Sequence, residues 1–428
     1  MKTDILIIGS GCAGLFCALH LPQDKQITII TKSDLESSDS FLAQGGMCVL
    51  KDEQDYDSFM EDTLKAGHYE NDRHSVDVMI RSSQDVLKDL LACGVDFHRD
   101  EDGELLYTKE GAHSAKRILF HADITGKEVT SKLLAAVKKL PNVTPYEHTA
   151  MVDLLVENNQ CYGAVVKKAD DTFDVITADT TVLATGGIGG LYQHSTNFKH
   201  LTGDALAVAI KYGVELKDVD YIQIHPTTFY TKDKKERSFL ISESVRGEGA
   251  KLRDKYGNRF VDELLPRDLL TKAIFAQMEK DGTEYVWEDL RDIPEEELEN
   301  HFPNIVKHCM EHGYDVRKEC IPVVPAQHYF MGGIKVNDMS KTSMESLYAI
   351  GETACNGVHG KNRLASNSLL ESLVFAKRAA QDISAKDSQD RWETYLQEHI
   401  EYYRDEDALE EEYKALVLKE IEKAKEAR

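Results

Sequence analysis

Short apolar runs and glycine turns alternate at the start of the chain. Residues 4–8 predict a buried strand, residues 12–21 a helix and residues 27–31 a second strand. A third buried parallel strand is expected at residues 181–184, directly before Thr185-Gly186-Gly187. Buried strands that are linked by a glycine turn and a helix are typical of a dinucleotide-binding fold.

Helices and a hairpin follow before the pattern changes. Apolar spacing predicts helices at residues 76–93 and 126–140, and a hairpin whose strands are residues 151–156 and 163–167. Residues 219–329 mix loops with charged helices, whereas residues 332–382 return to strand, glycine turn and helix. We therefore expect an α/β fold with three parts. These are a discontinuous Rossmann-like domain (1–218 and 330–385), an inserted α+β domain (219–329) and a short helical C-terminal segment (386–428).

Composition narrows the class of protein. Hydrophobic residues make up 42% of the 428 positions, which predicts a packed globular protein. The formal net charge of −24 argues against nucleic acid and anionic membranes as partners. The eight cysteines form no CxxC pair, and the sequence contains neither a signal peptide nor an apolar stretch of about 18 residues. We expect a soluble cytoplasmic protein.

A glycine motif lies between the first predicted strand and helix. Gly9-Ser10-Gly11-Cys12-Ala13-Gly14 fits G-x-G-x-x-G. Its first glycine permits a tight turn, the second lets the backbone approach a pyrophosphate, and the third brings the helix against the strand. A glycine-rich packing turn is the alternative. The acidic ribose ligand that usually ends the second strand is absent, because Lys32 stands there.

Three further segments favour FAD over NAD as the dinucleotide. The polar loop at residues 39–46 ends in two glycines and is able to wrap an isoalloxazine ring. Thr185-Gly186-Gly187 closes a strand beside the adenosine half, and Gly351-Glu352 places a carboxylate where a ribityl or ribose hydroxyl can bind. Each segment alone can be a plain turn, whereas their joint order along the chain is specific.

Seven motifs in this order resemble the flavoprotein family that contains succinate dehydrogenase, fumarate reductase and L-aspartate oxidase. The resemblance covers roughly residues 1–382. Within this family, the sequences of the motifs are most similar to those of the L-aspartate oxidases. The matching stretches are residues 110–114, 121–126, 223–227, 243–249, 266–268, 325–329 and 359–369.

The resemblance implies a set of flavin contacts and a mode of attachment. With the glycine motif, the implied cofactor-binding residues are Gly9, Ser10, Gly11, Cys12, Ala13, Gly14, Lys32, Asp39, Ser40, Phe41, Leu42, Ala43, Gln44, Gly45, Gly46, Asp204, Glu352, Ser368 and Leu369. Membrane-complex relatives carry a histidine that bonds covalently to the flavin in this loop. Asp39 occupies that position here, so the expected cofactor is non-covalently bound FAD.

A four-carbon dicarboxylate needs hydrogen-bond donors at both ends, and Arg meets carboxylate with two bonds. The family pattern supplies His225, Ser242, His328 and Arg363 for the carboxylates, and Arg267 near the reacting carbons. On residues alone, His225 can equally be a hydrogen-bonded core histidine. Arg267 can equally form a surface ion pair with Asp268.

The resemblance implies a role in proton transfer for one residue and a role in substrate choice for another. Arg267 is expected to exchange a proton with the substrate while the flavin takes a hydride from the neighbouring C–H. Glu110 is expected to pair with the substrate ammonium, because succinate-specific relatives carry a neutral glutamine in the matching motif. A surface pair of Glu110 with Lys109 or Lys116 is the alternative.

The implied reaction is oxidation of L-aspartate to iminoaspartate, the precursor of quinolinate and NAD, with dioxygen or fumarate as acceptor. The inserted segment would act as a capping domain. A soluble fumarate reductase or succinate dehydrogenase flavoprotein and a non-catalytic flavin-binding module are the alternatives. We expect a monomer, and association with quinolinate synthase is left open.

Two other features invite a function but receive none. His308, Cys309 and His312 have the i, i+4 spacing of a metal-binding helix. No third ligand and no HExxH pattern support a metal site, so we expect a solvated helix face and no metal. The charged tail can bind a basic partner, although an exposed helix is the simpler interpretation.

Overall fold

The computed structural model describes residues 1–232, 237–385 and 406–428. Within these residues the largest sheet has seven strands, six of them in the order β6-β2-β1-β9-β8-β7, with β16 pairing to β9. β1 pairs in parallel with β2 and β9, and β16 also runs parallel to β9, whereas β8 is antiparallel to both β7 and β9. The bounds of these strands are β1 Lys2–Ile8, β2 Ile27–Ile30, β6 Val143–Tyr146, β7 Ala150–Glu157, β8 Gln160–Lys167, β9 Phe173–Leu183 and β16 Leu347–Ala349.

Alternating side chains of β1 enter two different cores. Ile5 and Ile7 belong to the core beneath α1, α4, α5 and α11, whereas Leu6 and Ile8 belong to the core beneath α6 and α12. Because both faces are covered by helices, an apolar strand on both sides is the stable choice. The bounds of the helices that cover the sheet are α1 Cys12–His20, α4 Arg73–Ala92, α5 Thr125–Val137, α6 Asp204–Lys211, α11 Asn367–Ser384 and α12 Glu406–Glu426.

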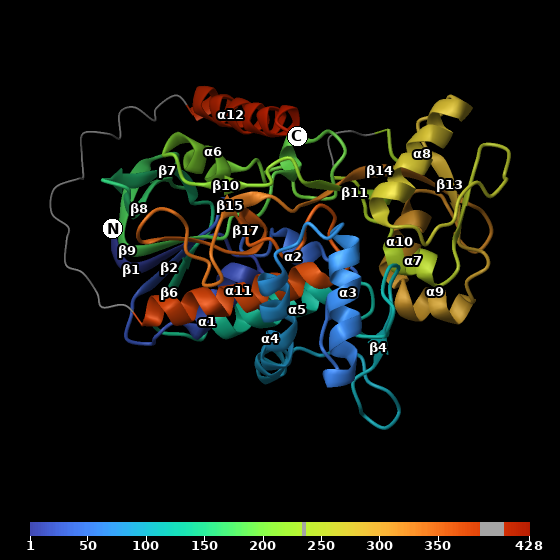
Figure 1. Cartoon of the computed structure of the whole chain (residues 1–428), viewed down its shortest axis with the longest axis horizontal. Helices are drawn as coiled ribbons and strands as arrows, with labels where there is room; N and C mark the ends of the chain where they lie inside the picture. The colour runs from blue at the N-terminus through green and yellow to red at the C-terminus, as the bar shows by residue number, and fades with distance from the viewer. Residues whose placement is uncertain (233–236, 386–405) are drawn as a thin grey trace.

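A second, antiparallel sheet has its own core beside the first (Figure 1). Its strand order is β11-β14-β13-β12. The segment at residues 219–329, here called the capping segment, contributes nearly all of this sheet and the four helices around it. The bounds are β11 Ile222–Phe229, β12 Lys251–Arg253, β13 Val286–Asp289, β14 Ile321–Phe330, α7 Glu243–Gly247, α8 Arg267–Asp281, α9 Glu295–His301 and α10 Pro303–Glu311. The exact domain boundaries stay a prediction.

Short elements connect the two sheets and line the space between them. Two small three-stranded sheets combine β3 with β4 and β5, and β10 with β15 and β17, within the described residues. The bounds are β3 Met47–Cys48, β4 Tyr107–Thr108, β5 Ile118–Leu119, β10 Leu216–Lys217, β15 Gly333–Lys335, β17 Ala354–Cys355, α2 Asp39–Leu42, α3 Tyr56–Ala66, and the 3-10 turns η1 Glu53–Asp55, η2 Gly189–Leu191 and η3 Gly351–Thr353.

The predicted α/β architecture is confirmed, although one strand is longer than predicted. The hairpin of β7 and β8 and the helices α4, α5 and α11 lie where the apolar spacing placed them. β9 begins at Phe173, well before the expected residue 181. Threonines and Asp179 interrupt its apolar run, and its first half pairs with β8 rather than lying between parallel strands.

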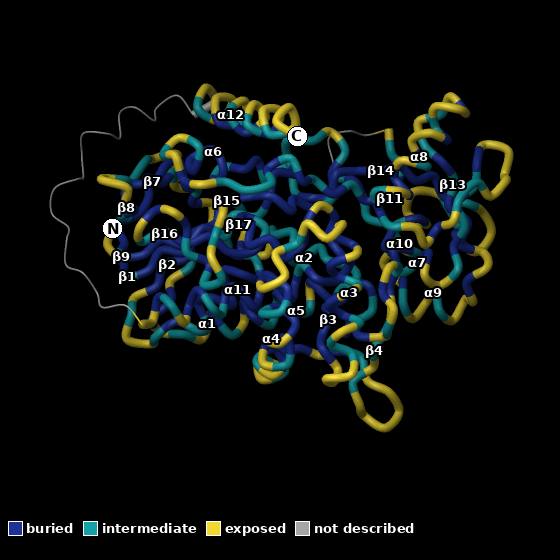
Figure 2. The backbone as a smooth tube through the Cα atoms, in the orientation of Figure 1, coloured by how far each residue is buried: buried dark blue, intermediate teal, exposed yellow. Residues whose placement is uncertain are grey.

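The C-terminal helix is amphipathic. Residues 386–405 of the predicted helical tail lie outside the described residues, whereas α12 packs on α6 (Figure 1). Tyr413, Val417 and Ile421 recur every four residues and are buried there. The outward side of α12 is exposed (Figure 2). The expectation of an exposed tail therefore holds for one face only. In the described parts of the chain, no helix has the length and apolarity needed to cross a membrane.

Candidate active site

One cavity extends from the first turn of α1 to the capping segment. Most of the predicted cofactor-binding residues lie on its wall: Gly9, Ser10, Gly11, Ala13, Lys32, Asp39, Ser40, Leu42, Ala43, Gln44, Gly45, Gly46, Asp204, Glu352, Ser368 and Leu369. Three do not, namely Cys12, Gly14 and Phe41. Cys12 and Gly14 face the protein interior as part of α1, and the ring of Phe41 lies below the Lys127 ammonium.

The glycine motif leaves a helix end without an N-cap side chain at the cavity, where the Cys12 N–H donates to Ser40 Oγ at 3.2 Å. The N-cap of α1 is Gly11, which makes no side-chain cap, and the first turn contains no acidic residue. Free N–H groups and the positive end of a helix dipole attract an anion such as a pyrophosphate. Gly9 has a φ of +119°, and a Cβ on Gly14 would lie 2.2 Å from the Gly9 carbonyl oxygen. The first and third glycines thus shape the turn and its packing.

Unpaired polar atoms mark the wall where a dinucleotide would lie. Ser38 Oγ, Asp39 Oδ2 and Gln44 Oε1 are buried and have no hydrogen-bond partner among the described residues. All three residues line the cavity, and unmet buried acceptors are costly unless a ligand supplies donors. Burial and nearby Asp39 raise the pKa of Glu352 to about 8. This acceptor-rich wall and the uncapped helix fit FAD, which carries ribose and ribityl hydroxyls, ring N–H groups and a pyrophosphate.

Lys32 has a protein partner at the cavity wall. Its Nζ donates to Asp204 Oδ2 at 2.6 Å and to Thr202 Oγ1 at 3.3 Å. Asp204 begins α6, so the ion pair joins the end of β2 to the start of that helix. The end of β2 carries Lys32 in place of an acidic residue. The Asp204 carboxylate, from a distant part of the chain, lies beside it.

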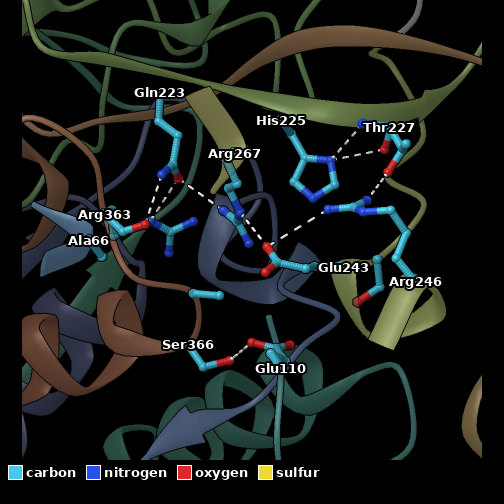
Figure 3. Close-up of polar contacts among 12 residues, drawn as sticks. Ala66, Glu110, Gln223, His225, Thr227, Glu243, Arg246, Arg267, Arg363 and Ser366 are labelled. Atoms are coloured by element: carbon cyan, nitrogen blue, oxygen red, sulfur yellow. Dashed lines mark hydrogen bonds and ion pairs between the residues drawn. The ribbon is translucent and has the colours of Figure 1, made fainter. Parts of the chain in front are cut away.

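Two arginines converge at the other end of the cavity (Figure 3). Arg267 Nη1 and Arg363 Nε donate to the same atom, Gln223 Oε1, at 2.9 and 3.2 Å. The amide nitrogen of Gln223 donates to Asn362 Oδ1 and to the Arg363 carbonyl oxygen. Burial and the Arg267 charge lower the pKa of Arg363 to about 10. Two buried cations side by side attract a dianion.

Arg267 does not form the surface pair with Asp268 that sequence alone allows. Its Nε donates to Glu243 Oε2 at 2.6 Å, while Asp268 instead lies 3.4 Å from His68 Nε2. Glu243 also lies 3.9 Å from Arg246 Nη2. Burial alone would raise the pKa of Glu243, but the charges of Arg267 and Arg246 outweigh it and lower that pKa. The three side chains Arg267, Glu243 and Arg246 form a continuous row of alternating charge (Figure 3).

The two cavity histidines are neutral. His225 Nδ1 contacts the backbone of Thr227 at 2.9 and 3.2 Å, and His328 Nδ1 lies 2.7 Å from Thr196 Oγ1. Burial and the nearby arginines lower the pKa of both rings well below the usual value. His225 therefore fits the description of a hydrogen-bonded core histidine and still lines the cavity. Among the described residues around these two histidines, the permanently charged cations that line the cavity are arginines.

Glu110 is buried at the cavity and does not form the surface lysine pair. Its side chain is 4% exposed. Oε2 accepts from Ser366 Oγ at 2.6 Å, and Oε1 accepts from Ser244 Oγ at 3.0 Å. Both partners are neutral hydroxyls, and within the described residues no cationic nitrogen forms an ion pair with Glu110. A buried carboxylate without an ion-pair partner favours the approach of a cationic group.

Three residues of the site received no role from the sequence. Gln223, Glu243 and Arg246 all lie in the motifs that carry the family resemblance, and all are buried. Their membership of these motifs was the available signal. The roles of these three residues depend on which arginine lies beside which acceptor in the folded chain. The spacing of residues along the sequence does not give this information.

The suspected metal group has a packing role. His308 stacks on Phe239 with ring centroids 3.6 Å apart, and Cys309 is fully buried in the core of the capping segment. His308 and Cys309 are therefore packed, which corrects the expectation of a solvated helix face for these two residues, whereas His312 is exposed as expected. Across residues 1–232, 237–385 and 406–428, no three His, Cys, Asp or Glu side chains form a group that can hold a metal ion.

Similarity to known proteins agrees with this geometry. Residues 4–369 match the FAD binding domain family. The chain is 51% identical to L-aspartate oxidase of Clostridium perfringens over 382 residues, covering 89% of this chain and 87% of that protein. It is 39% identical to a chloroplastic L-aspartate oxidase of Oryza sativa, covering 88% of this chain and 62% of that protein. Among solved structures, E. coli quinol fumarate reductase matches with a TM-score of 0.84 at 29% identity, covering 91% of this chain and 72% of that chain.

The chain therefore belongs to the FAD binding domain family of flavoproteins, within the group that contains L-aspartate oxidases and fumarate reductase flavoproteins. Its fold is the α/β FAD-binding fold with a capping domain and a C-terminal helix. The predicted family and fold are confirmed.

Proposed function

We propose that this chain is an FAD-dependent L-aspartate oxidase that produces iminoaspartate, with dioxygen or fumarate as electron acceptor. The relatives at 38–51% identity that cover about nine tenths of the chain support this assignment. The observation that carries it is Glu110, a buried carboxylate with no ion-pair partner among the described residues, in the same cavity as Arg267 and Arg363. A dicarboxylate with one ammonium complements that set of charges.

FAD would lie along the wall that begins at α1. The uncapped N-terminus of α1 would hold its pyrophosphate, and Asp39, Gln44 and Glu352 would accept from its hydroxyl and N–H groups. Asp39 stands in the loop where covalent relatives carry histidine, so we propose a non-covalent cofactor. Acid precipitation of the purified protein should release the flavin into the supernatant, and flavin retained in the pellet would contradict non-covalent binding.

The cavity would hold the substrate by both carboxylates. Arg363 presents a buried guanidinium, and His225 and His328 present neutral donors on the same wall, where the Ser242 hydroxyl would turn from Ser244 Oγ to a substrate carboxylate. A neutral imidazole donates through Nε2 when its Nδ1 accepts, which the Thr227 N–H at 3.2 Å provides for His225 and the Thr196 hydroxyl at 2.7 Å for His328. Glu110 would pair with the substrate ammonium and fix which carbon faces the flavin. This orientation supplies much of the rate enhancement that proximity can give.

Arg267 would move a proton. When bound, FAD accepts a hydride from the substrate carbon, and one proton must also leave for L-aspartate to become iminoaspartate. Arg267 is a cation and can accept a proton only as it passes another one on. Glu243 Oε2, 2.6 Å from Arg267 Nε, is placed to receive that second proton, with Arg246 next in the row.

A soluble fumarate reductase or succinate dehydrogenase flavoprotein is the second candidate, because solved fumarate reductases share the fold at 29% identity. A panel of L-aspartate, succinate and fumarate separates the two. The proposal expects L-aspartate to reduce the flavin with far higher kcat/KM than succinate. Turnover of succinate in preference to L-aspartate would replace the proposed function with the second candidate. Reduction by neither substrate would favour a non-catalytic flavin-binding module.

We also propose that the protein is a cytoplasmic monomer in which fumarate can replace dioxygen as acceptor. The eight cysteines are free in the structure, which suits a reducing compartment. The product is an unstable imine, so an enzyme that condenses it, quinolinate synthase in the implied pathway, is the proposed partner. Sedimentation of the purified protein with and without that enzyme tests both the monomer and the association.

A further inference from the structure

The two oxygens of Glu110 are held from two different parts of the fold. Ser366, which precedes α11, donates to Oε2 at 2.6 Å. Ser244, in α7 of the capping segment, donates to Oε1 at 3.0 Å. Ser366 has a φ of 62°, and its Oγ also accepts from the Gly46 N–H at 3.2 Å, so it is locked to the wall near the flavin loop.

The hydroxyl of Ser244 has a fixed direction. Ser242 caps the N-terminus of α7, where its Oγ accepts from the Ser244 N–H at 3.3 Å. The Ser242 hydroxyl lies 3.3 Å from Ser244 Oγ and donates to it, so the Ser244 hydrogen is free to point at Glu110. The preceding residue, Glu243, holds Arg267. The turn at residues 242–244 therefore contacts both the proposed proton carrier, Arg267, and the proposed ammonium ligand, Glu110.

Glu110 has little freedom on its other sides. A Cβ on Gly45 would lie 2.7 Å from Glu110 Oε1, and a Cβ on Gly111 would lie 2.5 Å from Glu243 Oε1. The backbone on both sides thus approaches these carboxylates closely. The remaining freedom is rotation of the carboxylate plane, and this is the freedom that a hydrogen bond to each oxygen removes.

We propose that Ser244 is a positioning residue for substrate choice, which fixes the Glu110 carboxylate in the orientation that pairs with a substrate ammonium. This inference rests on the proposed function. Ser244 acts through Glu110, so its loss penalises substrates that carry an amine and spares those that do not. A merely structural serine would affect both kinds of substrate equally.

The test is the holoenzyme carrying Ser244→Ala. The KM for L-aspartate should rise about 5- to 10-fold, as for one lost hydrogen bond to a charged group, with kcat changed less. Fumarate reduction by the chemically reduced flavin should stay within about twofold, because fumarate has no amine. Ser244→Thr keeps the hydroxyl and should restore the KM for L-aspartate. Ser238→Ala removes another buried serine of the capping segment and serves as the matched control.

A double-mutant cycle shows whether Ser244 acts through Glu110. In the Glu110→Gln background, Ser244→Ala should cause no further loss with L-aspartate, because the group that it orients has lost its charge. Equal losses on L-aspartate and fumarate, or additive losses in the cycle, would overturn the inference while leaving the proposed function in place. Failure of the unmodified protein to oxidise L-aspartate would overturn both. Flavin content and the melting temperature confirm that each variant is folded.

Discussion

Arg267 and Arg363 donate to one oxygen atom, Oε1 of Gln223, although the first arginine comes from the capping segment and the second precedes α11. Two guanidinium groups that share an acceptor repel each other, and burial together with this repulsion lowers the pKa of Arg363. Gln223 compensates part of this repulsion, and a bound dianion would compensate the rest. The substrate end of the cavity is thus electrostatically prepared for an acid with two carboxylates.

Gln223 should therefore be as important as the residues it holds. Gln223→Leu removes the shared acceptor and should lower kcat/KM for L-aspartate by about 10- to 100-fold, through loss of hydrogen bonds to two charged groups. Stopped-flow reduction of the flavin measures the loss. Gln277→Leu, which removes a buried glutamine of α8 that donates to Asp281, is the control. Similar rates for the two variants would show that the shared acceptor has no function.

Arg267 should be required for the reaction but not for the cofactor. Arg267→Leu removes the proton carrier between the substrate and Glu243 and should lower turnover by at least about 100-fold, as expected for loss of general acid–base catalysis. The visible spectrum of the bound flavin should be unchanged. The exposed Arg317→Leu of the same segment controls for loss of a surface charge. Near-normal activity of Arg267→Leu would exclude it from proton transfer.

Glu110 should discriminate by substrate. Glu110→Gln removes the charge that pairs with the ammonium and should lower kcat/KM for L-aspartate by about 10- to 100-fold, with a much smaller effect on fumarate. Steady-state kinetics with both compounds provide the ratio. The exposed Glu104→Gln is the matched control. If both substrates lose the same factor, Glu110 supports the fold and does not read the amine.

The sequence was sufficient to predict most of the residues that line the cavity, but it assigned no role to Gln223, Glu243 and Arg246 and could not predict how the side chains are paired. Glycine spacing and apolar runs predict the nucleotide-binding half because these patterns are local. The link from Lys32 to Asp204 and the hydrogen bond from Arg363 to Gln223 each join residues more than a hundred positions apart in the chain, and Arg267 and Gln223 are 44 positions apart. Such contacts depend on how the two sheets are placed. The neutral state of His225 and His328 likewise follows from burial, which the folded structure determines.

Glu288 should make stability depend on pH. Neither oxygen of this fully buried carboxyl has a partner among the described residues, and burial raises its pKa to about 7 despite the Arg246 charge. A folded pKa above the unfolded value stabilises the protein at low pH, and that stability is lost as the pH rises toward 7. Glu288→Gln should therefore stabilise the protein more at pH 8 than at pH 5, by on the order of 2 kcal/mol.

Denaturant unfolding of both proteins at the two pH values measures this difference. The exposed Glu296→Gln of the capping segment should change stability equally little at both pH values. A gain from Glu288→Gln that is the same at pH 5 and pH 8 would mean that the buried carboxyl does not titrate in this range.

Anaerobic titration of the purified holoenzyme with L-aspartate, followed by visible absorbance, tests the central assignment most directly. The arrangement of Glu110, Arg267 and Arg363 predicts that the oxidised flavin band bleaches as L-aspartate is added and returns when fumarate or air is admitted. A flavin that stays oxidised in excess L-aspartate would contradict the assignment.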